Sequence, residues 1–474
     1  MRAAARRKAV LLLAIAAAGC SSAQYRPRPL DQEAALAEYA QRDANVDGLR
    51  RFAAANGLAP AEWPPAQWGL RELTLVGLYF HPDLRIARAR AGLAHAQQAA
   101  ASQRPPAGMR VRPEHHSRDL EEEKGPWTLG IEFEIPVGGQ GRRDALAQRG
   151  AFLADAADLD VAAAAWRVRA GVRDRLLEVQ SARDALSGLE ARVAAQREIV
   201  ALIERRFQAG LLSSQDLASE KLALAQAEAA RDEQADAAGR AISDLALALG
   251  VPLEVARPMV LRFPGEAAPV QTDPATLQRL ALKNRLDVHR RLLEFGAADA
   301  EVKLAIASQN PGITLGPGYA WDQGDNVWSL AVGMSLPSPA RARAQLREGE
   351  AQREVAAQQF LATQVDAVAA TGAAAAGYRA AQERLESARG RMAQQQAQEA
   401  RVQHQFDAGS ADRLQRTQAR METLLAEGAV HRAALESRRA LGRLEDAVQR
   451  PLFGDFDNLP DMRAAGAALP PRQP

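Results

Sequence analysis

The chain repeats itself, and this repeat constrains its fold more than any other feature of the sequence. The segment WTLGIEFEIP at 127–136 is echoed by WSLAVGMSLP at 328–337. Matching residues lie about 200 positions apart elsewhere too: Asp83-Leu84 with Asp287-Val288, FQAG at 207–210 with FDAG at 406–409, and Pro252-Leu253 with Pro451-Leu452. This period is far longer than the roughly 20 to 50 residues of a solenoid unit. We therefore predict two copies of one half-domain.

The N-terminus has the layout of a bacterial signal peptide. Basic residues between Arg2 and Lys8 precede an uncharged run, 9–18, that is too short to span a bilayer. Cys20, the sole cysteine, follows Ala-Ala-Gly in a pattern that resembles a lipoprotein box. We expect residues 1–19 to be removed and Cys20 to be lipidated. The alternative is an ordinary secreted protein in which Cys20 is incidental.

Charge and cysteine content exclude several classes of function. Removing the four basic residues of 1–19 leaves 56 Lys and Arg against 58 Asp and Glu, a net charge of −2, which does not favour nucleic-acid binding. A single cysteine allows neither an internal disulfide nor a cysteine-based metal cluster. No later stretch is apolar enough for a transmembrane helix, so a membrane-crossing part would have to be a β-barrel.

Two segments alternate as membrane strands do. Over 127–136 and 327–336, large apolar residues occupy every second position, while small, polar or acidic residues lie between them. Candidate partner strands precede them at about 312–321 and, with a poorer pattern, about 108–117. An ordinary soluble antiparallel sheet also alternates and remains the alternative. Four strands are too few for a membrane barrel, which begins at about eight, so several copies must share one.

The rest of each half is predicted to be long helices. No proline interrupts 142–207, which as a helix would span on the order of 100 Å. Gly210 ends this helix, Ser213 offers an N-cap for a return helix ending at Gly250, and the second copy turns at Gly409. The route from Gly409 to the next leucine is two residues shorter, which predicts a shorter second turn. Apolar residues recur every seven positions, which favours helices packed side by side. The first row is Val172, Val179, Leu186, Val193, Val200 and Phe207, and the second is Tyr378, Leu385, Met392 and Phe406, broken at Glu399. A solvated coiled-coil rod is the alternative.

The N-terminal part of the mature chain has a separate pattern. Residues 31–58 predict one polar helix that ends at Gly57, and 63–68 an irregular link. We expect a lipid-anchored segment at 20–70, a first repeat at 71–253, a linker at 254–273, a second repeat at 274–452 and a disordered tail at 453–474.

Taken together, these features resemble the TolC-like outer-membrane factors of tripartite efflux and secretion systems. The lipoprotein signal, the duplicated strand pair with its helical hairpin, HPDL at 81–84, FQAGLLSSQDL at 207–217 and FDAG at 406–409 carry the resemblance over about 73–452. It implies a mainly α protein with a membrane β-barrel portion, in which three chains form a 12-stranded β-barrel and a 12-helix α-barrel. It also implies a lipid-anchored homotrimer in outer-membrane lipid that extends into the periplasm.

The resemblance further implies partners and site residues. The helical turns would meet a periplasmic adaptor protein, which connects the duct to an inner-membrane pump such as an RND transporter. The implied adaptor-contact tip consists of Gln208, Ala209, Gly210, Leu211, Leu212 and Ser213, with Asp407, Ala408, Gly409, Ser410 and Ala411. Glu132 and Glu134, if they face the lumen, place six carboxylates in a trimer and would favour cations; the alternative is that lumen residues are simply polar.

Conduction rather than catalysis is therefore the expected function. The chain has no phosphate-binding glycine loop, no HExxH and no GxSxG, and no cofactor is expected. His115-His116 beside the acidic run 121–123 could gather a metal ion, but a solvated loop is preferred and no metal site is assigned. We expect the outer-membrane channel of an efflux or type I secretion system. A periplasmic coiled-coil lipoprotein that acts as a spacer or scaffold is the alternative.

Overall fold

The computed structural model describes residues 25–58, 62–117, 126–263 and 273–452. The predictions on Cys20, the signal peptide at 1–19, the acidic run at 121–123, linker residues 264–272 and the tail at 453–474 lie outside these ranges. The chain up to Arg42 forms a unit of its own. That unit contains α2 (Gln32–Ala40), which starts at Asp31 because the Asp31 carboxylate accepts hydrogen bonds from two backbone N–H groups of the first turn.

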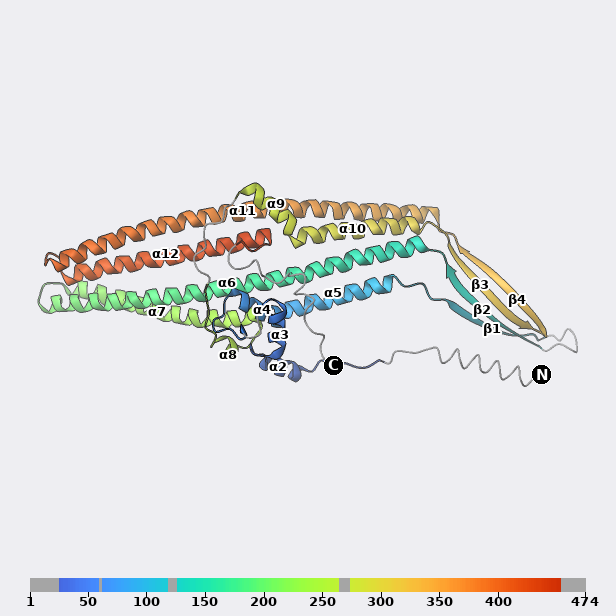
Figure 1. Ribbon diagram of the computed structural model, residues 1–474, viewed down its shortest axis with the longest axis horizontal. Helices are drawn as coiled ribbons and strands as arrows, with labels where there is room; N and C mark the ends of the chain where they lie inside the picture. Colours follow the sequence, from blue (N-terminus) through green and yellow to red (C-terminus); the bar gives the residue numbers. More distant parts are fainter. Residues whose placement is uncertain (1–24, 59–61, 118–125, 264–272, 453–474) are drawn as a thin grey trace. The chain divides into compact units, whose positions relative to one another are not determined.

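The unit from Asp43 onward consists of two matching sets of helices and one small sheet (Figure 1). The two longest helices each have 69 residues, and the helices that return from them each have 36. The matched pairs are α4 (Leu70–Phe80) with α9 (Pro274–Asn284), α5 (Pro82–Ala101) with α10 (Leu286–Ala307), α6 (Gln140–Gln208) with α11 (Pro339–Asp407), and α7 (Ser214–Leu249) with α12 (Arg413–Val448). The mainly helical fold with a duplicated strand pair is confirmed. Among the described helices, none is both long and apolar enough to cross a membrane.

The sheet joins the two repeats at their ends. Its described strands run antiparallel in chain order: β1 (Gly108–His115), β2 (Trp127–Val137), β3 (Gly312–Asp322) and β4 (Asp325–Ser335). The central pairing, β2 with β3, connects the first repeat to the second. β3 and β4 are linked by Gln323 and Gly324, which both have positive φ, as tight two-residue hairpins require. β1 and β4 are the edge strands, so this single chain has no closed barrel within the described residues.

The helices of the two repeats meet along α6. This helix contacts α4, α5 and α7 of its own repeat, and α10 and α12 of the other. The predicted seven-residue seam is buried in its first part, where Val172 and Val179 are at most 1% exposed, but Phe207 at the far end is 38% exposed. The side chains of this row are therefore more exposed at the end of α6 that leads into its turn.

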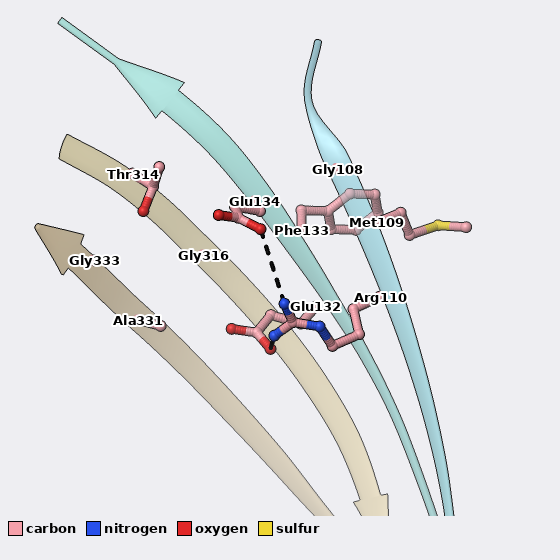
Figure 2. A pocket seen from close by; sticks show the side chains of 10 residues that line it. All are labelled: Gly108, Met109, Arg110, Glu132, Phe133, Glu134, Thr314, Gly316, Ala331 and Gly333. Carbon is pink, nitrogen blue, oxygen red and sulfur yellow. Dashed lines mark ion pairs between the residues drawn. The ribbon is translucent and has the colours of Figure 1, made fainter. Parts of the chain in front are cut away.

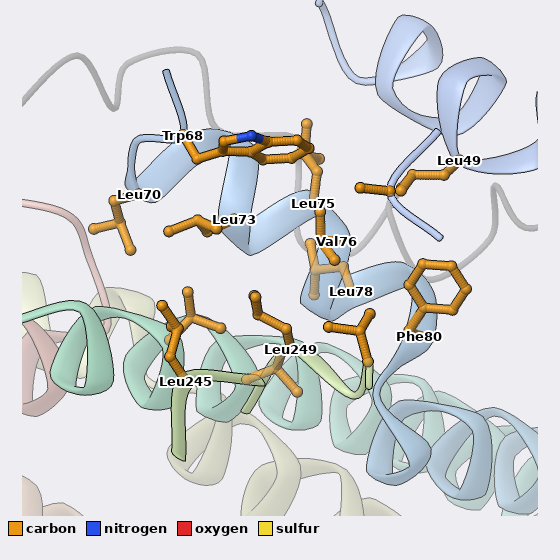
Figure 3. Packing of buried hydrophobic residues seen from close by; sticks show 14 of the residues in the cluster. Leu49, Trp68, Leu70, Leu73, Leu75, Val76, Leu78, Phe80, Leu245 and Leu249 are labelled. Carbon is orange, nitrogen blue, oxygen red and sulfur yellow. The ribbon is translucent and has the colours of Figure 1, made fainter. Parts of the chain in front are cut away.

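The main core surrounds α4, whose side chains are buried on nearly every side (Figure 3). α6 and α7 cover one side, while α3 (Asp47–Ala55) lies against α4 as well. The prediction of one polar helix over 31–58 is wrong: two helices form, and α3 buries Leu49, Phe52 and Ala53. Phe52 follows Leu49 by three positions and Ala53 follows Phe52 by one, so all three lie on one face of a short amphipathic helix.

Candidate functional site

The sheet has one apolar face and one polar face. The register aligns Val111, Ile131, Tyr319 and Trp328 in a row across all four strands, and the Tyr319 and Trp328 rings lie 4.9 Å apart. Other large side chains of this face are also exposed, among them Met109, Leu129, Phe133, Leu330, Val332 and Met334. Trp328 is 80% exposed. A patch of this kind is unusual on a water-soluble monomer and marks an interaction surface.

The polar face carries the predicted residues Glu132 and Glu134, and both lie close to Arg110 on β1 (Figure 2). The guanidinium of Arg110 is 3.6 Å from the Glu132 carboxylate and 3.9 Å from the Glu134 carboxylate. These three side chains line a hollow of about 340 Å³ whose other wall is formed by small residues of β3 and β4. The carboxylates are therefore paired rather than isolated.

A hydrogen-bonded chain connects the strands at the other end of the sheet. Thr128 donates to Asp322 across the β2–β3 pairing, and its hydroxyl lies 2.9 Å from a ring nitrogen of His116. The ring of His115 packs edge-on against Trp127. Within the described ranges, no three His, Cys, Asp or Glu side chains are grouped as metal ligands.

The two predicted turns lie at the opposite end of the long helices, and both use a left-handed glycine. Gly210 has φ +73° and Gly409 has φ +76°, a conformation that favours glycine because it has no Cβ. Ser213 caps α7 and Asp412 caps α12, each in a capping box. In both turns two residues lie between the glycine and the N-cap, so the predicted shortening of the second turn is wrong. The leucine spacing differs only because the leucines occupy different positions in the return helices.

The other tip residues have distinct places in these turns. Gln208 and Asp407 end α6 and α11, and Ala209 and Ala408 are their C-caps. Leu211 is 72% exposed, whereas Leu212 packs against a small cluster of Ile199, Ile203 and Leu414. In the second turn, the N–H groups of Ser410 and Ala411 both donate to the carbonyl of Gln405. The two turns thus have the same length and the same left-handed glycine but different side chains.

The structure brings the two turns together. Arg206 of α6 donates to Asp412 at 2.6 Å, and Arg413 of α12 donates to Glu198 of α6 at the same distance. The hydrogen bond from Arg413 lowers the pKa of Glu198, and a backbone hydrogen bond from Gln415, helped by Arg206, lowers the pKa of Asp412. These two ion pairs, a third between Arg416 and Glu198 at 4.0 Å, and the cluster at Leu414 therefore fasten α12 to the end of α6.

Sequence reasoning missed a buried charged cluster between α6 and α12. Arg169 is fully buried 3.4 Å from Glu445, and Arg173 lies 3.3 Å from Glu445 and 2.7 Å from Asp446. The indole N–H of Trp166 also donates to Asp446. A signal was present, because Arg169 and Arg173 are one helical turn apart on the face that carries Val172. Their partners, more than 260 residues away, gave no comparable signal.

Comparisons with known proteins agree with this architecture. The family described as Outer membrane efflux protein matches residues 277–448. Protein CyaE of Bordetella pertussis is 32% identical over 252 residues, which cover 49% of this chain and 52% of CyaE. The chain thus spans about half the length of this curated relative.

Solved structures with the same fold cover more of the chain. The outer membrane protein VceC of Vibrio cholerae aligns with a TM-score of 0.67 and 19% identity, over 81% of this chain and 96% of VceC. The CmeC outer membrane channel of Campylobacter jejuni aligns with a TM-score of 0.67 and 13% identity, over 95% and 98%. The resemblance inferred from the sequence is confirmed: residues 277–448 match the Outer membrane efflux protein family, and the chain has the same fold as the outer membrane proteins VceC and CmeC.

Proposed function

We propose that the protein is a passive exit duct in the bacterial outer membrane, serving efflux or type I secretion. The observation that carries this proposal is that one chain combines an exposed apolar sheet with long helices. An antiparallel sheet with an exposed apolar face continues into long helices that end in turns fastened to each other. Exposing that face to water costs roughly 25 cal/mol for each Å² of apolar surface, a cost that lipid removes.

The duct is a homotrimer in this proposal. The unpaired edges of β1 and β4 would cost several kcal/mol for each unsatisfied backbone group in lipid, so each must meet another strand. Three copies supply a 12-stranded β-barrel, and their long helices supply a 12-helix α-barrel. Exposed apolar residues on α11, namely Val355, Leu361 and Val365, support contact between copies along the helices.

The helical turns are the proposed contact for a periplasmic adaptor, which would connect the duct to an inner-membrane pump such as an RND transporter. Leu211 supports this assignment, because a leucine at a turn that is 72% exposed is available to a partner. Replacing Leu211 with Ser should abolish co-purification with the adaptor of the host's own system. Leu222→Ser, a change at another exposed leucine that lies on α7 away from the turn, should not affect co-purification.

Lipidation of Cys20 is the proposed anchor, and Glu132 and Glu134 are proposed to face the lumen. The decisive test is fractionation of the full chain. A duct should be recovered from outer membranes in detergent as a heat-modifiable trimer that conducts ions in planar bilayers. Cys20→Ala should lose acylation but keep the trimer. Recovery of this variant as a water-soluble monomer would instead support the spacer alternative and overturn the duct.

A further inference from the structure

On the polar face of the sheet, the half formed by β1 and β2 is the charged half, and the half formed by β3 and β4 carries charge only at its hairpin end, on Asp322 and Asp325. β1 and β2 contribute all of its Arg and Glu side chains, while the facing positions of β3 and β4 carry small residues: Thr314, Gly316, Gly318, Ser329, Ala331 and Gly333. Gly316 leaves space for Glu132, since a Cβ there would lie only 3.2 Å from the Glu132 carboxylate oxygen. Charged side chains thus reach over a wall that presents almost no side chains of its own (Figure 2).

Arg110 occupies the centre of this charged half. The register places it directly opposite Glu132, and Glu134 is two residues further along the same face of β2. One guanidinium therefore pairs with two carboxylates, that of Glu132 at 3.6 Å and that of Glu134 at 3.9 Å. Exposed pairs of this kind add little stability, because solvent screens them. Their effect on the local potential is direct, since removal of Arg110 changes the charge of the three-residue group from −1 to −2.

We propose that Arg110 is the residue that makes the lumen wall weakly selective by charge, so that the duct passes anionic and neutral cargo as well as cations. This inference rests on the proposed function. With Arg110 present, a trimer carries −3 at this level, and without it −6. A ring of six uncompensated carboxylates would concentrate cations and repel anions, as acidic rings do in cation channels. The arrangement of Arg110 prevents that outcome.

The first test measures the local potential in the full-length protein. Ala331→Cys places a thiol in the hollow beside the charged group. Its rates of modification by a cationic and an anionic methanethiosulfonate reagent are compared in low salt, with the protein lacking this substitution as the blank. Adding Arg110→Gln should raise the cation-to-anion rate ratio on the order of fivefold. An unchanged ratio overturns the proposal.

Matched variants separate this effect from a general loss of positive charge. Arg112→Gln removes the same charge from the same face, but Arg112 pairs with Glu114 and does not line the hollow that contains Ala331, so its charge acts on the thiol from farther away. The cation-to-anion rate ratio should therefore rise less in Arg112→Gln than in Arg110→Gln. Replacing Glu132 and Glu134 with Gln in the Arg110→Gln protein removes all three charges and should bring the ratio down to its original value or below. An equal response to Arg112→Gln, or no rescue by the double Gln change, contradicts the assignment.

The second test measures selection by the duct itself. In a planar bilayer with a KCl gradient, Arg110→Gln should shift the reversal potential toward that of a cation-selective pore, and high salt should suppress the shift because the screening length falls to about 3 Å at 1 M. A normal conductance with an unshifted reversal potential overturns this inference while leaving the duct intact. Absence of any conductance from the unsubstituted protein overturns the proposed function, and the thiol ratios still report the potential at Arg110.

Discussion

At the residue scale, the cluster of Arg169, Arg173, Glu445 and Asp446 is the strongest constraint on how the two repeats pack. Burial, together with the nearby charge of Arg173, lowers the pKa of Arg169, and Glu445 opposes this by favouring the charged guanidinium. Gly442 makes room for the cluster, since a Cβ there would lie 2.8 Å from the Arg173 guanidinium. Each buried charge is retained because a partner from the other repeat faces it.

Replacing Glu445 with Gln should therefore destabilise the protein strongly. The side chain keeps its shape but loses the charge that compensates two buried arginines, and breaking a buried pair costs about 3 kcal/mol or more. Urea unfolding in detergent, followed by circular dichroism, measures the change. Glu436→Gln on the same helix is the control: its pair with Arg439 is exposed, so the free energy of unfolding should change by less than about 1 kcal/mol. Equal losses in both variants would contradict this account.

The sequence predicts interactions between residues that are close in the chain better than interactions between distant residues. Gly210 and Ser213 were correctly identified because a left-handed glycine and an N-cap act within a few residues. The pairing of Arg169 with Glu445 joins positions 276 apart, and nothing near either residue indicates it. The pairing of Arg110 with Glu132 was missed for a related reason, because it depends on the register of two strands.

At the element scale, the helical hairpins depend on the conformation of their turn glycines. Gly210→Ala should destabilise the first turn by about 1 kcal/mol, because a Cβ is unfavourable at φ +73°. Amide protection measured by hydrogen exchange should fall in peptides covering 205–216. Gly188→Ala lies in the interior of α6, where a Cβ would meet open space, and should leave that protection unchanged. Unchanged protection in Gly210→Ala would show that the turn tolerates a side chain.

The contacts between the two turns should also respond to acid. The pKa of Glu198 is lowered from 4.5, chiefly by the hydrogen bond from Arg413, so its contribution is present above about pH 4.5 and is lost as the pH falls through the lowered value. Protection factors near Ile203 and Leu414, corrected for intrinsic exchange, should therefore drop below pH 4.5. Glu198→Gln should remove much of this pH dependence, whereas Glu204→Gln should preserve it, because Glu204 pairs with Lys221 inside one hairpin. A pH response identical in all three proteins would exclude Glu198 as its source.

The helix patterns in the sequence also explain which helices were predicted well and which were not. The long helices were predicted well because periodicity and absent prolines extend over dozens of residues. α4 was not distinguished as a core element, although nearly all its side chains are buried, because an 11-residue apolar segment has the same pattern whether one side or every side is covered. Two of the covering elements, α6 and α7, come from distant parts of the chain.

At the scale of the whole molecule, the sheet implies more than one copy. Large apolar residues alternate with small or polar ones on both edge strands, and β4 is as long as the central strands, whereas β1 is three residues shorter. Soluble proteins usually block exposed edges with bulges, prolines or charge. β1 contains Pro113 and charged residues, but β4 has no proline and carries charge only at its first residue, Asp325. In an assembly that closes, β4 of one copy would run antiparallel to β1 of the next, as neighbouring strands do within the chain.

Engineered cysteines across these edges should produce a covalent ladder that stops at three chains. Val111→Cys on β1 is combined in turn with Cys at Leu330, Val332 or Met334 on β4, all on the apolar face, because the register between copies fixes which pair comes within disulfide distance. Oxidation of the matching pair should give a closed trimer on denaturing gels, and each single-cysteine parent should remain monomeric there, since one edge alone cannot bond to its own counterpart. A ladder extending beyond three chains would mean that the edges join in open polymers, and bands ending at two would mean that the sheet closes with a single partner. A ladder that stops at three chains would show that both edge strands of each four-stranded sheet pair with neighbouring copies in a closed trimer, as the proposed duct requires.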